Sequence, residues 1–192
     1  MNLFLVRLGG QSAVSIYGIL MYVEGFIQSL LYGMCDSLQP AVGYNWGAKQ
    51  FSRVKAIEKC CFSASAILSA LAALVIFCFP AQITGLFMKA ADDAFVTAAV
   101  QALTLFSLTY LTRWLSFATQ SYMLAIEKPV PASVISVSTA LFFPVILLLA
   151  LWPLQLTGIW LNFAGTSLLA AILSGIILKR FLKTDHNAKM HI

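Results

Sequence analysis

Charged side chains are scarce in this sequence. Only 10% of its 192 residues are Asp, Glu, Lys or Arg, whereas 60% are apolar and the mean hydropathy is +0.89. Roughly a quarter of the residues in a water-soluble domain are charged, so this chain lacks the polar groups that would cover a globule in water. The composition therefore predicts an integral membrane protein.

The sequence also lacks the motifs of enzymes, metal sites and disulfide frameworks. Its four cysteines show no CxxC spacing and accompany no histidine cluster. No nucleophile elbow and no phosphate-binding loop is present. The net charge of +5 does not indicate nucleic acid, because the basic residues cluster between apolar runs. We therefore expect no catalysis, no metal, no cofactor and no nucleic-acid partner.

Long apolar runs are what the sequence has in abundance. A membrane-spanning helix needs about 20 predominantly apolar residues, and five segments meet this length. They cover residues 11–44, 60–88, 95–126, 131–154 and 157–182. The connections between them are too short for a soluble domain. The predicted fold is an all-α helical bundle of about five transmembrane helices.

Basic residues lie mainly on one side of the predicted spans. With alternating crossings, nine Lys and Arg fall on the face formed by the loop 45–59, the turn 127–129 and the C-terminal segment, against two on the other face. Because Lys and Arg concentrate in cytoplasmic loops, the C-terminus is predicted to be cytoplasmic. The expected location is a multi-pass position in the plasma (inner) membrane.

The chain divides into three predicted parts. Residues 1–10 are too short to span and have no cationic leader, so they are interpreted as the stump of a truncated transmembrane helix. Residues 11–182 form the transmembrane lobe, and residues 183–192 form a cytoplasmic tail. The start of the chain therefore looks truncated.

Glu24 is the first of three ionisable residues within the predicted spans. Charged groups at membrane depth are costly and often functional. On a helix of about 3.6 residues per turn, Glu24 shares a face with Tyr17 and Gln28. This stripe could line a water-filled cavity that holds a proton or a cationic substrate. The alternative is that Glu24 lies near the outer interface and is solvated there.

Asp36 and Arg113 are the other two ionisable residues within the predicted spans. Arg113 has Gln120 on its face and needs an acidic partner, for which Glu24 or Asp36 is available. The pair would be either a structural contact or a gate that opens when the carboxylate takes a proton. Asp36 belongs to a stripe of small residues that would let another helix approach closely, unless Asp36 is a solvated cap at the cytoplasmic end. The stripe consists of Gly18, Gly25, Ser29, Asp36 and Gly43.

Two segments carry a resemblance to a known family. They are GGQSAVSIYGI at 9–19 and DSLQPAVGYNWGAKQFSRVKA at 36–56. Together they resemble the second half of the multidrug and toxic compound extrusion (MATE) transporters. Gln120, the turn 127–129, Pro144 and the segment 156–160 extend the resemblance over nearly the whole chain. Its most specific residues are Gln39, Pro40, Tyr44, Asn45, Gly47, Ala48 and Lys49.

This resemblance implies a fold and a function. The chain would be helices eight to twelve of a two-lobe carrier, and residues 1–10 would be the end of helix seven. Such a carrier exports drugs or organic cations in exchange for H⁺ or Na⁺. The implied partners are the lipid bilayer, the drug and the missing N-terminal lobe. Glu24 is the expected cavity carboxylate, with support from Asp36 and Arg113.

Two other functions remain open. The chain could be a transport-incompetent lobe, or an interaction subunit that completes a separately encoded N-terminal half. It could also be related to flippases of lipid-linked oligosaccharides or lipid II, which usually have several basic residues in the cavity. Arg113 is the only basic residue available here.

Overall fold

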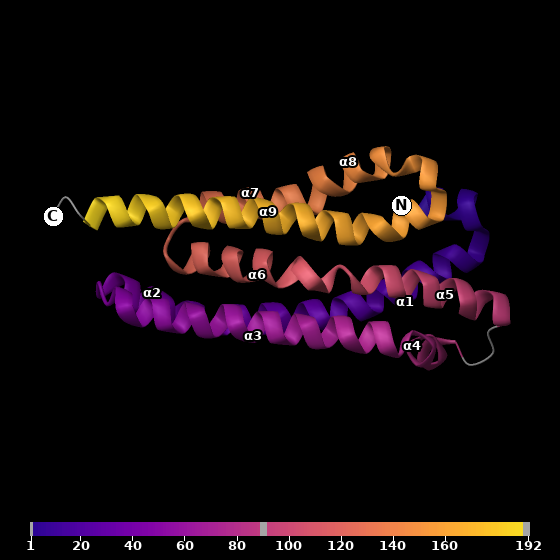
Figure 1. Ribbon diagram of the computed structural model, residues 1–192, viewed down its shortest axis with the longest axis horizontal. Helices are drawn as coiled ribbons and strands as arrows, with labels where there is room; N and C mark the ends of the chain where they lie inside the picture. Colours follow the sequence, from indigo (N-terminus) through magenta and orange to yellow (C-terminus); the bar gives the residue numbers. More distant parts are fainter. Residues whose placement is uncertain (1, 89–91, 190–192) are drawn as a thin grey trace.

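The computed structural model describes residues 2–88 and 92–189, and within these ranges all of its regular elements are helices. The elements are α1 (Asn2–Ser37), α2 (Gln39–Gly47), α3 (Phe51–Cys78), α4 (Pro80–Phe87), α5 (Asp93–Ser107), α6 (Tyr110–Ala125), α7 (Pro129–Val137), the π-helix η1 (Ser138–Phe142), α8 (Phe143–Ala150), the 3₁₀-helix η2 (Trp152–Leu154) and α9 (Gln155–Lys189). The long helices lie side by side along one axis (Figure 1).

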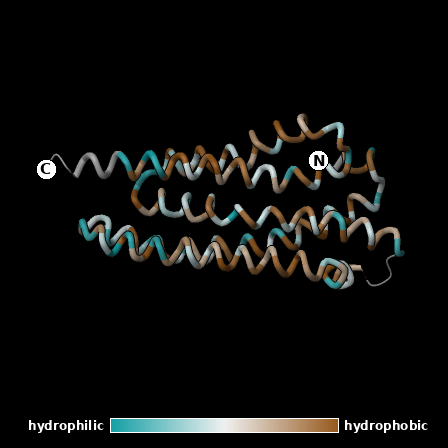
Figure 2. The backbone as a smooth tube through the Cα atoms, viewed as in Figure 1, coloured by the Kyte–Doolittle hydropathy of each residue, from teal (hydrophilic) through white to brown (hydrophobic). Residues whose placement is uncertain are grey.

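The described part of the chain has four helices that are long and apolar enough to cross a membrane. A fifth span is added if α5 and α6, which meet at an angle of 46°, are counted as one bent helix. Hydrophilic positions gather at the end of the bundle that holds α2 and the α6–α7 connection (Figure 2). The predicted all-α membrane bundle of about five spans is confirmed.

The helix α6 lies at the centre of the bundle. It packs against α3 and α1 on one side and against α7 and α9 on the other, so the bundle has three layers (Figure 1). Phe106, Tyr110 and Phe117 of the α5–α6 span belong to the main buried cluster, together with Leu20 and Leu31 of α1. The middle layer therefore places its side chains between the helices of the other two.

The helix α1 contains a sharp break at Gly10. This glycine has φ 63° and ψ −155°, a backbone conformation that is easily reached only without a Cβ atom. The break lies at the boundary that the sequence predicts between residues 1–10 and the first complete span. The chain before Gly10 is therefore a separate short helix that leads into the long helix of 27 residues, 11–37.

The basic segment 45–59 is not the long loop that the sequence predicts. The helix α2 ends at Gly47 and α3 begins at Phe51, so only residues 48–50 separate them. Lys55 and Lys59 are exposed on the first turns of α3, where flexible side chains keep their charged ends in water. The second predicted span also ends early, at Cys78, because Pro80 starts a new helix.

Candidate functional site

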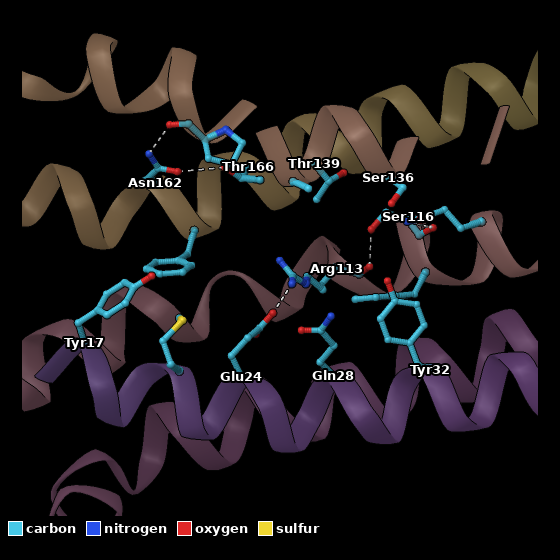
Figure 3. Close-up of a pocket in the computed structure, with 16 residues that line it drawn as sticks. Tyr17, Glu24, Gln28, Tyr32, Arg113, Ser116, Ser136, Thr139, Asn162 and Thr166 are labelled. Carbon is cyan, nitrogen blue, oxygen red and sulfur yellow. Dashed lines mark hydrogen bonds and ion pairs between the residues drawn. The ribbon is translucent and has the colours of Figure 1, made fainter. Parts of the chain in front are cut away.

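A cavity of about 380 Å³ lies between α1, α6, the α7–η1–α8 segment and α9. Figure 3 shows that side chains from these elements point into it from different sides. Of the six predicted cavity residues, five line it: Tyr17, Glu24, Gln28, Arg113 and Gln120. The structure therefore brings together residues of α1 and α6 that are far apart in the sequence.

Glu24 and Arg113 form an ion pair in the wall of this cavity (Figure 3). The second carboxylate oxygen, Oε2, accepts a hydrogen bond of 2.5 Å from the hydroxyl group of Tyr110. Only 8% of Glu24 is exposed, so it is not solvated at the surface of the bundle. The interpretation of Glu24 as a cavity residue paired with Arg113 agrees with this geometry, and the pairing of Arg113 with Asp36 is wrong.

The bend between α5 and α6 positions Tyr110 and Arg113. Hydroxyl groups of two neighbouring helices reach the backbone at this bend, and the Thr109 carbonyl also accepts the N–H of Arg113 at 3.1 Å. Here the Tyr110 carbonyl accepts a bond of 2.5 Å from the Ser69 hydroxyl, and the Thr109 carbonyl accepts one of 2.7 Å from Ser167. Hydroxyl groups from α3 and α9 therefore hold the start of α6 in place beside Glu24.

Arg113 has further contacts that keep its side chain in the cavity. Its guanidinium carbon lies 5.3 Å from the ring centre of Phe117, a cation–π contact. The ring of Phe117 in turn packs edge-on against Tyr32 at 4.3 Å between centroids. Because the charges of Arg113 and Glu24 compensate one another, the site is close to neutral as long as the pair is intact.

The opposite wall of the cavity is irregular. Phe143 donates its backbone N–H to the carbonyl of Ser138, a π-helical bond, and Pro144 follows with no N–H to donate. Asn162 of α9 donates a hydrogen bond of 2.9 Å to the Pro144 carbonyl. Thr166 donates one of 3.1 Å to the side-chain oxygen of Asn162. Asn162 therefore joins α9 to the start of α8.

Aromatic and apolar groups line the end of the cavity near Tyr17. The ring of Tyr17 lies 6.1 Å from that of Phe163, and Met21 lines the same region. Aromatic rings and a methionine provide an adaptable apolar surface. The cavity thus combines one buried ion pair, several amide and hydroxyl groups, and a surface that fits an organic molecule.

Asp36 lies outside this cavity. Its side chain is exposed and accepts a hydrogen bond of 2.7 Å from the amide of Gln39. The close helix packing predicted along its stripe is wrong within the described chain, because a Cβ atom at Gly18 or Gly25 would meet no atom within 4 Å. Gly43 is the exception, since a Cβ atom there would lie 3.2 Å from the carbonyl oxygen of Ala125.

The family-motif residues form the corner between α1, α2 and α3 and not the cavity. Gln39 also donates a bond of 3.1 Å to Ser121 of α6, and Pro40 lies in the first turn of α2. Asn45 donates to the Ala41 carbonyl at 2.8 Å. Tyr44 is exposed, as are the last three motif residues, Gly47, Ala48 and Lys49. The motif therefore shapes one end of the bundle.

The sequence reasoning missed several residues of the site. Tyr110 and Phe117 were available as aromatic side chains close to Arg113 on the same helix, at spacings of three and four residues. Tyr32 was also available, because it follows Gln28 by four residues on the same helix. Ser136 and Thr139 gave no comparable signal, because only the fold brings α7 and η1 to the cavity. Among the described residues, no group of three or more His, Cys, Asp or Glu side chains could hold a metal ion.

Solved structures with the same fold are membrane transporters. An outward-facing structure of a multidrug resistance MATE family transporter of the MOP superfamily matches with a TM-score of 0.85 and 14% identity, over 95% of this chain and 41% of that one. An inward-facing structure of such a transporter matches with a TM-score of 0.85 and 14% identity, over 94% of this chain and 42% of that one.

A third structure, of MATE in complex with MaL6, has a TM-score of 0.85 at 14% identity, over 95% of this chain and 42% of that one. Identity this low shows the fold alone, and the chain spans less than half of these proteins. The fold is therefore the one found in part of these transporters. The MatE family model matches residues 1–149, so the chain belongs to the MatE family. No curated protein matches the sequence.

Proposed function

We propose that this chain is the C-terminal lobe of an antiporter that exports drugs or organic cations in exchange for H⁺ or Na⁺. The observation that carries the proposal is the ion pair of Glu24 and Arg113 inside a cavity with an aromatic surface. An ionisable group at membrane depth is rarely kept unless it binds or moves a charge. In this lobe it lies where a drug-sized molecule fits.

The exchange uses the two charge states of Glu24. With the carboxylate ionised, the pair with Arg113 closes the cavity wall, and an organic cation can compete with Arg113 for the same oxygens. A proton on Glu24 removes the negative charge, which weakens the hold on either cation. A ligand shifts a conformational equilibrium only through its different affinities for the two states, and the charge change at Glu24 supplies this difference.

The orientation of the lobe belongs to the same proposal. Exposed basic residues surround the end of the bundle that holds α2, the α6–α7 connection and the end of α9. We call this region the basic end, and its members include Lys49, Arg53, Lys55, Lys59 and Lys128. Because Lys and Arg favour the cytoplasmic side, we place the basic end in the cytoplasm and the chain in the plasma membrane.

Efflux measured in cells tests the proposal. The lobe is produced together with an N-terminal half, and the export of a fluorescent organic cation is recorded with and without a proton or sodium gradient. Glu24→Gln should reduce export at least tenfold, because glutamine cannot change its charge. Glu127→Gln is the matched control, since Glu127 is exposed in the α6–α7 turn and lies outside the cavity. Unchanged export and ion dependence in Glu24→Gln would overturn the assignment.

A second candidate function is a subunit that transports nothing alone and acts together with an N-terminal half, since the chain aligns with 41% of a solved transporter of the same fold. Export by the lobe alone would reject this candidate, and export restored only by co-expression would support it. A flippase for pyrophosphate-linked lipids is less well supported, because the one arginine in the cavity is already paired with Glu24.

A further inference from the structure

A second cavity, of about 280 Å³, lies between the first one and the basic end of the bundle. Both cavities are lined by Tyr32, Gln120 and Ser136, so they meet at these three side chains. The second cavity is also lined by Asp36 and by Ala132 near the start of α7. It therefore leads from the Glu24 site towards the end of the bundle where α6 and α7 connect.

One row of side chains on α1 runs along both cavities. Glu24, Gln28, Tyr32 and Asp36 follow one another at intervals of four residues, so each is a neighbour of the next on the helix surface. The row covers about 18 Å along the axis and winds about a third of a turn around α1. Its first three members line the first cavity, and its last two line the second.

The facing helix α6 supplies polar partners for this row. Arg113 and Ser116 face the first cavity, Gln120 lines both, and Ser121 lines the second. Gln39 connects the Asp36 end of this row to α6, because its side-chain amide donates hydrogen bonds to Asp36 at 2.7 Å and to the Ser121 hydroxyl at 3.1 Å. Polar groups therefore follow one another on both sides from Glu24 to Asp36.

The two cavities are large enough for ordered water. A water molecule takes about 30 Å³ and needs two to four polar partners, so both cavities have space for several. Tyr32 stands at their junction, where its ring packs edge-on against Phe117 of α6 at 4.3 Å. The side chain of Tyr32 therefore lies between the two cavities.

We propose that this row is a water-filled path that carries a proton between the basic end and Glu24, with Asp36 at its mouth and Tyr32 as its gate. The path rests on the proposed exchange at Glu24. A hydronium ion would give its proton to a carboxylate oxygen of Glu24 and remain as water, while Arg113 keeps its charge.

Thiol labelling in membrane vesicles tests the path without any transport assay. The reporter is Thr139→Cys, since Thr139 lines the first cavity and not the second. The parent carries Cys60→Ser and Cys78→Ser, because these two cysteines are exposed whereas Cys35 and Cys61 are buried. A cationic trimethylammonium thiosulfonate and an anionic sulfonate analogue are applied from the side of the basic end, and labelling rates are compared.

The size of the side chain at position 32 should set the rate at which the reporter cysteine is labelled. Tyr32→Ala should speed labelling of the reporter and Tyr32→Trp should slow it, with at least a tenfold difference between the two. Tyr22→Ala is the matched control, because Tyr22 lies on the same helix and is 71% exposed. Equal rates in the two Tyr32 variants would overturn the gate, since the reagent would then reach the reporter by another route.

The negative charge of Asp36 at the mouth of the path should make the cationic reagent label the reporter faster than the anionic one. Asp36→Asn should lower the ratio of cationic to anionic labelling about tenfold, because one charge at about 6 Å in water changes each of the two rates about threefold and in opposite directions. Glu127→Gln should leave the ratio unchanged. No labelling from this side, or a ratio that ignores Asp36, would reject the path. Intact labelling together with unchanged efflux in Glu24→Gln would instead reject the exchange and leave the water path standing.

Discussion

The ion pair between Glu24 and Arg113 makes a sharp prediction about stability. The side chains of Arg113 and Glu24 are 14% and 10% exposed. Removing one member of a buried pair leaves an uncompensated charge, which costs about 3–5 kcal/mol, whereas removing both is often close to neutral. The perturbation is therefore a cycle of three variants: Arg113→Gln, Glu24→Gln and the double variant.

The two single variants should differ in magnitude. Arg113→Gln leaves the carboxylate of Glu24 with the hydroxyl of Tyr110 as its remaining hydrogen-bond donor in the structure, so we expect a loss of about 3–5 kcal/mol. Glu24→Gln keeps an acceptor for Tyr110 and leaves Arg113 over the ring of Phe117. Because Arg113→Gln loses this cation–π contact and Glu24→Gln keeps it, a difference of about 1 kcal/mol, we expect a loss of about 2–4 kcal/mol.

The free energy of unfolding can be measured by SDS titration of the chain in mixed micelles, followed by far-ultraviolet circular dichroism. The double variant should lie within about 1 kcal/mol of the parent, which gives a large coupling energy between the two positions. Glu127→Gln, an exposed carboxylate, should change stability by less than about 0.5 kcal/mol. A double variant that loses the sum of the two single losses would refute the reasoning, because the charges would then act independently.

Three further predictions concern the fold, and each can be checked by the same titration. Gly158→Ala should destabilise the protein strongly, because the new Cβ atom would lie 2.2 Å from the backbone oxygen of Leu151. Gly18→Ala is its control and should be neutral or stabilising by up to about 1 kcal/mol, since nothing lies within 4 Å of that position. Glu127→Gly should stabilise by about 0.5–1 kcal/mol, because Glu127 has φ 59°. Asp92→Ala should cost about 1 kcal/mol, as it removes the side-chain acceptor at the start of α5.

The spans and the central ion pair could be predicted from the sequence. Hydropathy depends on local composition, so five apolar segments were visible without knowledge of their packing. Glu24 and Arg113 stood out because a charge in a span requires a partner. The hydrogen bond between them joins residues 89 positions apart, yet few charged residues in the spans were available as partners. Scarcity of charge made this long-range contact predictable.

Other parts of the site depended on packing that local patterns do not contain. The stripe of Gly18, Gly25 and Asp36 predicted a close helix contact, but within the described chain the two glycines face no neighbour. A small residue permits close approach without requiring it. Thr139 likewise reaches the cavity only because the α7–η1–α8 segment packs beside α9. Neither outcome follows from spacing along one helix.

The polar residues inside the spans divide into two groups that the sequence could not separate. Ser69 and Ser167 are fully buried and donate to backbone carbonyls at the bend between α5 and α6. Glu24 and Gln28 instead face the cavity. The difference lies in what each side chain contacts, because the serine hydroxyls donate to backbone carbonyls at the bend, whereas Glu24 and Gln28 line the cavity. The bend that the serine hydroxyls stabilise is also the bend that directs Arg113 to Glu24. The buried serines therefore support the ion pair that the cavity contains.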